Sequence, residues 1–376
     1  MTRQAQRHTL GRPKHEKKRQ EPARYAHLDA LRALAVLLVV FSHAGLTFVP
    51  GGSGVTIFFV ISGFIITHLL IRERETTGSF NLAGFYARRF LKILPPLILI
   101  IVIPSLVWWA SGRPLDPLDF LGQIFFFFNL RYLDSQVTVL PGSNVVWSLS
   151  IEEQFYLFFA LFWLLLLRVR NYRAWLIGLG WGLIIWSLVI RTVLHLGGAS
   201  SDRIYFGTDT RLDAIVLGML AAIYYQGIRQ ARNHRHNVHQ ENFWGGPWVP
   251  AASALLYLLT LIIRDDFFRD TIRYSLQAAA AGAFLLWGLT ASKNPLNQKL
   301  LAAFKNPALQ KIGLASYSIY LVHQVIFKAI HHWLEPLPLA AQVAIQVPLA
   351  LGIGLIIYQT LEVPIQDYKN KKYRRR

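Results

Sequence analysis

Long apolar runs recur along this chain from Leu28 to Leu361, and short polar connections separate them. A helix needs about 20 apolar residues to cross a bilayer, because it rises about 1.5 Å per residue. Ten runs approach that length: Leu28–Val49, Val55–Ile71, Ile93–Ala110, Trp147–Leu167, Ala174–Leu194, Gly207–Gln226, Trp248–Ile263, Ile272–Ala291, Ile312–Trp333 and Leu339–Leu361. The pattern predicts an all-α, polytopic integral membrane bundle of about ten transmembrane helices. We expect the first run to be a retained helix rather than a cleavable signal peptide.

The charges of the connections predict how these helices are oriented. Ten spans that start in the cytoplasm place four basic connections on the cytoplasmic side: Arg72–Lys92, Arg168–Arg173, Arg229–Arg235 and Lys293–Lys311. Lys and Arg are enriched in the cytoplasmic loops of membrane proteins. We therefore expect both termini in the cytoplasm, with a disordered basic tail at residues 1–24, a transmembrane domain at residues 25–364 and a second basic tail at residues 365–376.

Composition supports a membrane protein. Of the 376 residues, 53% are hydrophobic and 16% are charged, and the mean hydropathy is +0.35. The formal net charge of +19 would suit nucleic-acid binding, but the positive residues gather in the tails and connections, and neither tail has interleaved aromatic residues on a folded platform. We therefore expect membrane lipids, and no nucleic acid, as partners. The chain has no cysteine, which excludes disulfides, thiolate catalysis and cysteine metal sites.

Four segments depart from the spanning pattern. Phe120–Leu130 is apolar but too short to cross, so we interpret it as a re-entrant or interfacial segment. Pro95–Pro96 and Pro336–Pro338 are predicted to break or begin helices, since proline lacks an N–H. The histidines of Asn233–His239 could bind a metal, but a solvated polar loop is the simpler interpretation, and we expect no metal site.

Two ionisable residues, Arg32 and His43, lie in the first apolar run. Eleven helical steps of about 100° return almost to the same face, with a rise of about 16 Å between the two side chains. The predicted topology places Arg32 near the cytoplasmic end and His43 about 9 Å inside the outer end. Ionisable groups inside a membrane are costly, so this pair marks a candidate functional site.

Carboxylates are expected in the same outer layer as His43. Glu152 and Glu153 lie about 8 Å inside the outer end of their span, and Arg211 and Asp213 begin another span from the outside. A neutral histidine can take a proton from a hydroxyl group while a carboxylate orients its ring. The pattern therefore favours an outer-half cavity that transfers an acyl group to an alcohol.

Structural roles are the alternative for these residues. His43 could bond to a neighbouring helix and fix packing. Ser150 and Glu153 have the spacing of a helix capping box, in which the glutamate only stabilises the helix start.

Three further features could have either a functional or a structural role. Arg88 and Arg89 lie in a basic, aromatic cytoplasmic connection where a phosphate-rich donor could dock, although snorkelling and topology control also explain such clusters. Gly63, after Ser62, would let two helices approach closely. His323 would lie near the midplane of the bilayer, either as a packing residue or as a site residue.

Several motifs together resemble the membrane acyltransferase-3 family of bacterial O-acyltransferases. They occur in order between Arg24 and Pro364: Leu28-Asp29-x-x-Arg32 with His43, Gly54-Val55-x-Ile57-Phe58-Phe59-Val60-Ile61-Ser62-Gly63-Phe64, Phe85-Tyr86-x-Arg88-Arg89 with Pro95, Trp147-Ser148-Leu149-Ser150-Ile151-Glu152-Glu153-Gln154-Phe155-Tyr156, Thr210-Arg211-Leu212-Asp213 with Gly218, Ser316-Tyr317-Ser318-Ile319-Tyr320-Leu321-x-His323, and Glu362-x-Pro364.

The resemblance implies a bundle of about ten helices in the bacterial inner (plasma) membrane. It implies transfer of an acyl group, usually acetyl, from cytoplasmic acyl-CoA to a hydroxyl of a glycan, a lipid-linked sugar or a small molecule. Acyl-CoA would be a cosubstrate, and no cofactor would be bound permanently. The implied catalytic residues are His43, as the base, with Glu152 and Glu153, and the implied substrate-binding residues are Arg32, Arg88, Arg89, Arg211, Asp213 and His323.

The sequence differs from the family pattern in two respects, and one alternative function remains. The family often carries Asp at the position of Thr56, and an extracellular hydrolase-like domain that some members have is missing, so we expect this chain to act with its membrane domain alone. The rival is a transporter or flippase, whose polar midplane residues would move a substrate unaltered. We find no internal repeat, and the ordered histidine and carboxylate motifs favour chemistry.

Overall fold

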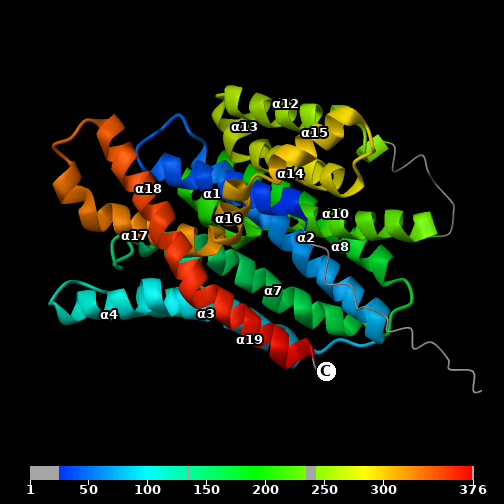
Figure 1. Cartoon of the computed structure of the whole chain (residues 1–376), viewed down its shortest axis with the longest axis horizontal. Helices are drawn as coiled ribbons and strands as arrows, with labels where there is room; N and C mark the ends of the chain where they lie inside the picture. The colour runs from blue at the N-terminus through cyan, green and yellow to red at the C-terminus, as the bar shows by residue number, and fades with distance from the viewer. Residues whose placement is uncertain (1–24, 134–135, 234–242, 375–376) are drawn as a thin grey trace, which may run out of the picture.

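The computed structural model describes residues 25–133, 136–233 and 243–374. The predicted tail at residues 1–24 and the histidines after Asn233 lie outside these ranges. Every regular element in the described residues is a helix, as the sequence predicts, and the helices pack into one bundle (Figure 1).

The helices follow in this order: α1 (Ala26–His43), α2 (Gly51–Thr77), α3 (Leu82–Leu97), a π-helical turn (Ile98–Val102), α4 (Ile103–Ala110), α5 (Pro117–Ile124), α6 (Phe128–Arg131), a 3-10 turn (Ser143–Val145), α7 (Val146–Leu166), α8 (Tyr172–Leu196), α9 (Ser201–Phe206), α10 (Thr208–Asn233), α12 (Trp248–Ile262), α13 (Asp266–Asp270), α14 (Ile272–Thr290), α15 (Pro295–Phe304), α16 (Pro307–Leu314), α17 (Ser316–Leu334), α18 (Leu339–Ile357), a second π-helical turn (Tyr358–Glu362) and α19 (Val363–Arg374).

Six helical segments of the described chain are long and apolar enough to cross a membrane: Ala26–His43, Gly51–Thr77, Leu82–Ala110, Ser143–Leu166, Tyr172–Leu196 and Leu339–Lys369. They correspond to six of the ten predicted spans. The other four predicted spans fall on α10, α12, α14 and α17, of which α12 is apolar but only 15 residues long. The count of ten and the cytoplasmic termini therefore stay predictions.

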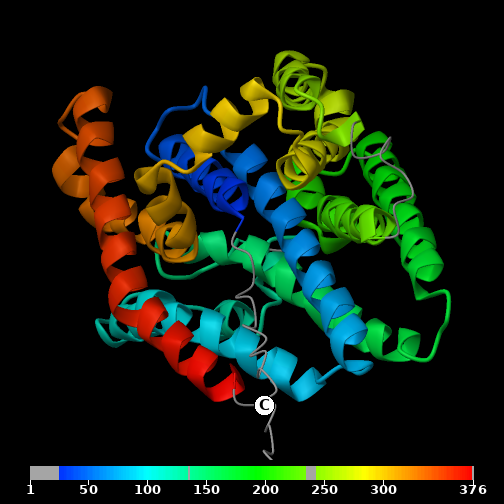
Figure 2. The ribbon, with the colours of Figure 1, turned by 45° about the vertical axis from the view of Figure 1, so that its right-hand side comes forward.

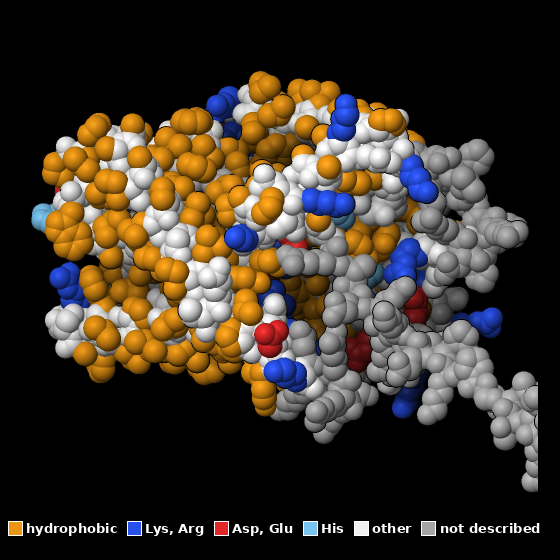
Figure 3. Space-filling view, viewed as in Figure 1, with side chains coloured by type: hydrophobic (Ala, Val, Ile, Leu, Met, Phe, Trp, Pro, Cys, Tyr) orange, Lys and Arg blue, Asp and Glu red, His pale blue; other side chains and the backbone are white. Residues whose placement is uncertain are grey.

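The outside of the bundle is strongly apolar. Large hydrophobic side chains stand exposed on several helices, among them Phe158 (70%), Leu165 (72%) and Trp333 (71%). Orange hydrophobic atoms predominate on the left-hand part of the face in Figure 3. A soluble protein rarely exposes such continuous apolar area, so this surface fits contact with lipid.

Glycines bring the central helices close together. A Cβ on Gly63 of α2 would collide with the carbonyl of Ile215 in α10, and a Cβ on Gly218 of α10 would collide with the carbonyl of Val60 in α2. Figure 2 shows α2 crossing the middle of the bundle. The predicted close approach at Gly63 is confirmed, and its partner is α10.

Three local predictions have different outcomes. The proline pair Pro95–Pro96 does not break its helix: α3 runs through both residues and joins α4 through the π-helical turn that follows them. Phe120–Leu130 forms parts of the short helices α5 and α6. Residues 365–374 continue helix α19, so this part of the predicted tail is helical.

Candidate active site

A cavity of about 330 Å³ opens beside the C-terminal end of α1. This volume lies at the lower end of the range for small-molecule sites. Residues from α1, α2, α7, α9 and α17 and from the loop before α7 line it: Val39, Ser42, His43, Gly51, Gly52, Val55, Tyr132, Asn144, Val145, Trp147, Tyr205, Phe206, Tyr320 and Gln324. The cavity therefore joins segments from across the sequence around His43.

His43 contacts a second histidine. Its Nδ1 lies 2.9 Å from Nε2 of His323, which comes from α17. His43 is exposed at the cavity, whereas His323 is fully buried. The sequence placed His43 in the outer part of its span and His323 near the midplane without joining them, and the structure brings the two rings together.

Aromatic rings form one wall of the cavity. Tyr132 stacks on Phe206 with 4.5 Å between the ring centres. The centre of the Trp147 ring lies 4.9 Å from the ring centres of both Tyr205 and Phe206. Burial raises the pKa of Tyr205 to about 12, although the nearby Arg211 opposes this shift. The Tyr205 hydroxyl therefore keeps its proton at neutral pH. Sequence reasoning missed this wall, because its members come from loops and helix ends without a common motif.

The structure does not place Glu152 and Glu153 beside His43. Glu153 accepts from Nε of Arg89 at 2.7 Å, and Glu152 accepts from the Ser62 hydroxyl at 2.5 Å. The Arg89 guanidinium also covers the ring of Tyr156 at 3.5 Å. Neither glutamate lines the cavity, and the cavity lining contains no carboxylate.

Adjacent α7 residues point in different directions around the helix, which explains this difference. The depth of a residue along a helix fixes its layer in the membrane, but its angular position decides which cavity it faces. The expected carboxylate partner of His43 is thus replaced by an imidazole.

Arg211 and Asp213 do not pair with each other. Asp213 accepts from Nη2 of Arg191 at 2.8 Å, and both side chains are fully buried. Arg211 donates from Nη2 to the Thr56 hydroxyl at 3.0 Å, while its Nε and Nη1 have no hydrogen-bond partner. Its guanidinium lies 4.0 Å from the centre of the Tyr274 ring.

Arg211 is therefore a buried cation beside the cavity wall without a carboxylate bonded to it. Its bonded partner, Thr56, is the position at which the resemblance described above implies Asp.

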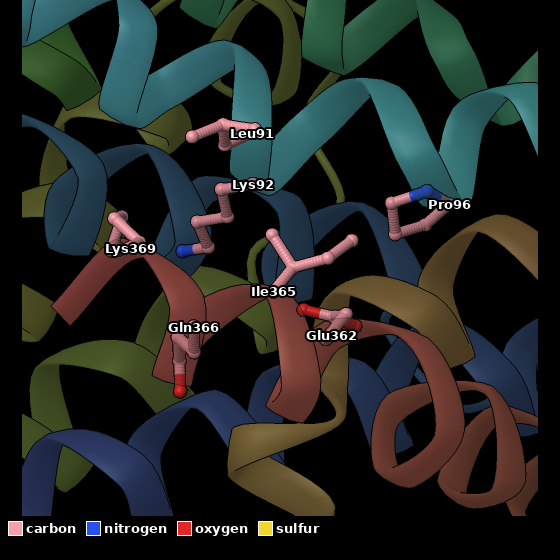
Figure 4. Close-up of a pocket in the computed structure, with 7 residues that line it drawn as sticks. All are labelled: Leu91, Lys92, Pro96, Glu362, Ile365, Gln366 and Lys369. Carbon is pink, nitrogen blue, oxygen red and sulfur yellow. The ribbon is translucent and has the colours of Figure 1, made fainter. Parts of the chain in front are cut away.

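A basic pocket lies between α3 and α19, toward the predicted cytoplasmic ends of these helices (Figure 4). Lys92, Glu362 and Lys369 line it, and Lys92 also lies within electrostatic reach of Arg32. Arg32 itself lies 4.0 Å from Asp29. Sequence reasoning missed Lys92, although it follows Arg88 and Arg89 in the same basic run.

The two arginines of that run are engaged elsewhere. Arg89 is held by Glu153, and Arg88 donates to Glu73 at 3.4 Å. Within the described residues, no group of three or more potential ligand side chains could hold a metal ion.

Comparison with known proteins shows that the chain is similar to acyltransferases. A family model described as an acyltransferase domain, that of the acyltransferase-3 family, matches residues 25–359. Peptidoglycan O-acetyltransferase OatA of Listeria monocytogenes is 30% identical over 92% of this chain and 58% of its own length. "Putative O-acetyltransferase SAS0844" of Staphylococcus aureus is 29% identical over 95% of this chain and 59% of its own length. "Putative peptidoglycan O-acetyltransferase YrhL" of Bacillus subtilis is 27% identical over 93% of this chain and 56% of its own length.

These matches decide the class. The predicted resemblance to the acyltransferase-3 family is confirmed, and six helical segments of the described chain are long and apolar enough to cross a membrane. The chain belongs to the acyltransferase-3 family. It spans less than two thirds of the length of the relatives named above. No solved structure matches it.

Proposed function

We propose that this protein is an O-acyltransferase of the bacterial plasma membrane, which moves an acetyl group from cytoplasmic acetyl-CoA to a hydroxyl group of a cell-envelope glycan. The observation that carries the proposal is His43, exposed in an aromatic-walled cavity while its Nδ1 bonds to His323. His43 is the general base of the reaction. Its second ring nitrogen, Nε2, is left to take the proton of the attacking hydroxyl.

The cavity wall supports a sugar as acceptor. Tyr132, Trp147 and Phe206 offer flat apolar faces, while Asn144 and Gln324 offer polar groups in the same lining. A few polar groups that fix orientation on a mainly apolar lining are the usual composition of a ligand site. Two of the relatives carry peptidoglycan in their names, and we propose the same acceptor class here.

The basic residues around the pocket support binding of a phosphate-bearing donor at the surface, because the pocket itself, at about 10 Å³, has room for only about one water molecule. Arg32, Lys92 and Lys369 gather near the predicted cytoplasmic surface, where CoA phosphates would arrive. Arg and Lys bind phosphate oxygens through charge-assisted hydrogen bonds. We propose that these three residues hold the donor. Arg88 and Arg89, the sequence-based candidates, instead shape this side through Glu73 and Glu153.

The acyl group passes directly from the thioester to the acceptor hydroxyl. The acceptor oxygen forms a bond to the acyl carbon while His43 takes its proton, and the C–S bond of the thioester breaks. The proton held by His43 then passes to the departing thiolate. Products are an O-acyl ester and free CoA.

Acetyl transfer by the purified full-length protein tests the proposal. The protein in detergent micelles is incubated with acetyl-CoA labelled in the acetyl group and with soluble peptidoglycan fragments. We expect label in the glycan as an ester that mild alkali releases. Unlabelled fragments together with intact acetyl-CoA would contradict the proposed donor and acceptor.

A further inference from the structure

The contact between His43 and His323 also defines the relative orientation of the two imidazole rings. The ring centres lie 5.1 Å apart with 24° between the ring planes, and the two nitrogens are 2.9 Å apart. Face-to-face stacked rings do not bring nitrogens this close, so the rings meet edge to edge. Such an approach is a hydrogen bond in which one nitrogen donates and the other accepts.

Backbone carbonyls decide the tautomer of His323. Its Nδ1 lies 2.6 Å from the carbonyl oxygen of Tyr320 and 3.2 Å from that of Ile319. A carbonyl oxygen can only accept a hydrogen bond, so Nδ1 of His323 carries the hydrogen. A neutral imidazole has one N–H, and Nε2 of His323 is therefore an acceptor.

The tautomer of His43 follows from that of His323. Because Nε2 of His323 accepts, Nδ1 of His43 must donate the bond between them. The hydrogen of neutral His43 is thus on Nδ1, and the lone pair is on Nε2. The Nε2 lone pair is the feature that a general base needs.

We propose that His323 is a positioning residue for this reaction, which holds His43 in the tautomer and orientation that expose a basic Nε2 to the acceptor hydroxyl. It performs the role that a carboxylate performs in many histidine-dependent enzymes, in a cavity whose lining has no carboxylate. The inference rests on the proposed function of His43 as base.

The backbone carbonyls also act after proton transfer. When Nε2 of His43 takes the hydroxyl proton, the ring becomes an imidazolium whose Nδ1–H still donates to His323. The negative ends of the Tyr320 and Ile319 carbonyl dipoles point at the far side of His323 and stabilise positive charge spread across both rings. No further reactant is needed, because the proton later leaves from His43 to the thiolate.

Nitrogen-15 NMR of the full-length protein in detergent micelles tests the tautomer directly. The histidine rings are labelled, and the His43 signals are assigned as those lost in His43→Ala. We expect a protonated Nδ1 and an unprotonated Nε2 in the wild-type protein. In His323→Leu this preference should be lost. An unprotonated Nδ1 in wild-type His43 would overturn the inference.

Activity variants test the consequence. His323→Leu removes the acceptor, and we expect kcat to fall roughly 10- to 100-fold with KM for acetyl-CoA little changed. His323→Gln has an amide oxygen that can accept from His43, so it should regain part of the loss. His68→Leu is the matched control, since His68 is a buried histidine that bonds to Gln226 and does not line the cavity.

Different results would contradict the proposed base, His43, and the proposed positioning residue, His323. Unchanged activity in His43→Ala would defeat the proposed base. Loss of activity in His43→Ala with full activity in His323→Leu would leave the base in place and defeat only the positioning role.

Discussion

His43 takes its partner from a position 280 residues away in the chain. Both histidines could be singled out from the sequence, because an imidazole in an apolar run is costly without a use. Their pairing could not be predicted, since depth along two separate helices says nothing about which faces meet. The same limit explains why Glu152 and Glu153 were expected beside His43 and instead lie against Ser62 and Arg89.

Arg211 gives a prediction at the same scale. Its guanidinium is fully buried, with Nε and Nη1 unpartnered and the Thr56 hydroxyl as its bonded neighbour. Thr56→Asp would place a carboxylate beside this cation. An unsatisfied buried polar group costs about 1–3 kcal/mol, so we expect Thr56→Asp to unfold at a higher temperature than the wild-type protein.

Thermal unfolding in micelles measures this effect. Thr56→Val is the matched control, because it keeps the shape and removes the acceptor, and it should unfold at a lower temperature than the wild-type protein. If Thr56→Asp were less stable than Thr56→Val, Arg211 would not lack a counter-ion in the folded protein.

At the scale of elements, the sequence predicts helices well where apolar runs are long. It predicts less well where one helix joins the next. The pair Pro95–Pro96 was expected to break or begin a helix, but α3 runs through both residues and continues through a π-helical turn into α4. Proline removes a backbone donor and clashes with the carbonyl four residues before it, and helices inside a membrane tolerate both where neighbouring groups satisfy the freed backbone. Such adjustment depends on neighbouring helices, which periodicity does not show.

The contact between α2 and α10 carries an element-scale prediction. A Cβ on Gly218 would meet the Val60 carbonyl, whereas a Cβ on Gly227 of the same helix would meet no atom within 4 Å. Overpacking a tight contact costs roughly 1–3 kcal/mol. We therefore expect Gly218→Ala to lower the unfolding temperature.

Gly227→Ala is the control within the same helix. Alanine favours helix over glycine by about 1 kcal/mol, so this variant should be as stable as the wild-type protein or more stable. Equal stability of the two alanine variants would show that α2 and α10 are not held as closely as described.

At the scale of the whole molecule, the all-helical membrane architecture follows from hydropathy, and six helical segments meet the length and composition of a span. The remaining helices are harder to assign because polar residues used inside the protein lower their hydropathy. Helix α10, for example, buries Thr210, Arg211 and Asp213 against other helices. A hydropathy pattern counts these residues as polar without knowing that protein surrounds them.

The distribution of polar groups across the molecule is consistent with transfer through the membrane domain. Arg32 lies toward the start of α1 near the basic pocket of Lys92, and His43 ends the same helix at the aromatic cavity. One continuous helix thus connects the proposed donor and acceptor sides. The sequence predicted that Arg32 and His43 lie on one helix. The structure adds that Arg32 lies near the basic pocket and His43 lies at the aromatic cavity.

The central claim is that His43 is the base of acyl transfer. The direct measurement is the rate of acetyl transfer from acetyl-CoA to peptidoglycan fragments by full-length wild-type protein, His43→Ala and His332→Ala, at equal amounts of folded protein. His43 is exposed at the end of α1, so its truncation removes little packing, and His332 is an exposed histidine of α17 that does not line the cavity. We predict a loss of roughly 10²- to 10⁴-fold in His43→Ala and none in His332→Ala. Transfer by His43→Ala at the wild-type rate would contradict the account.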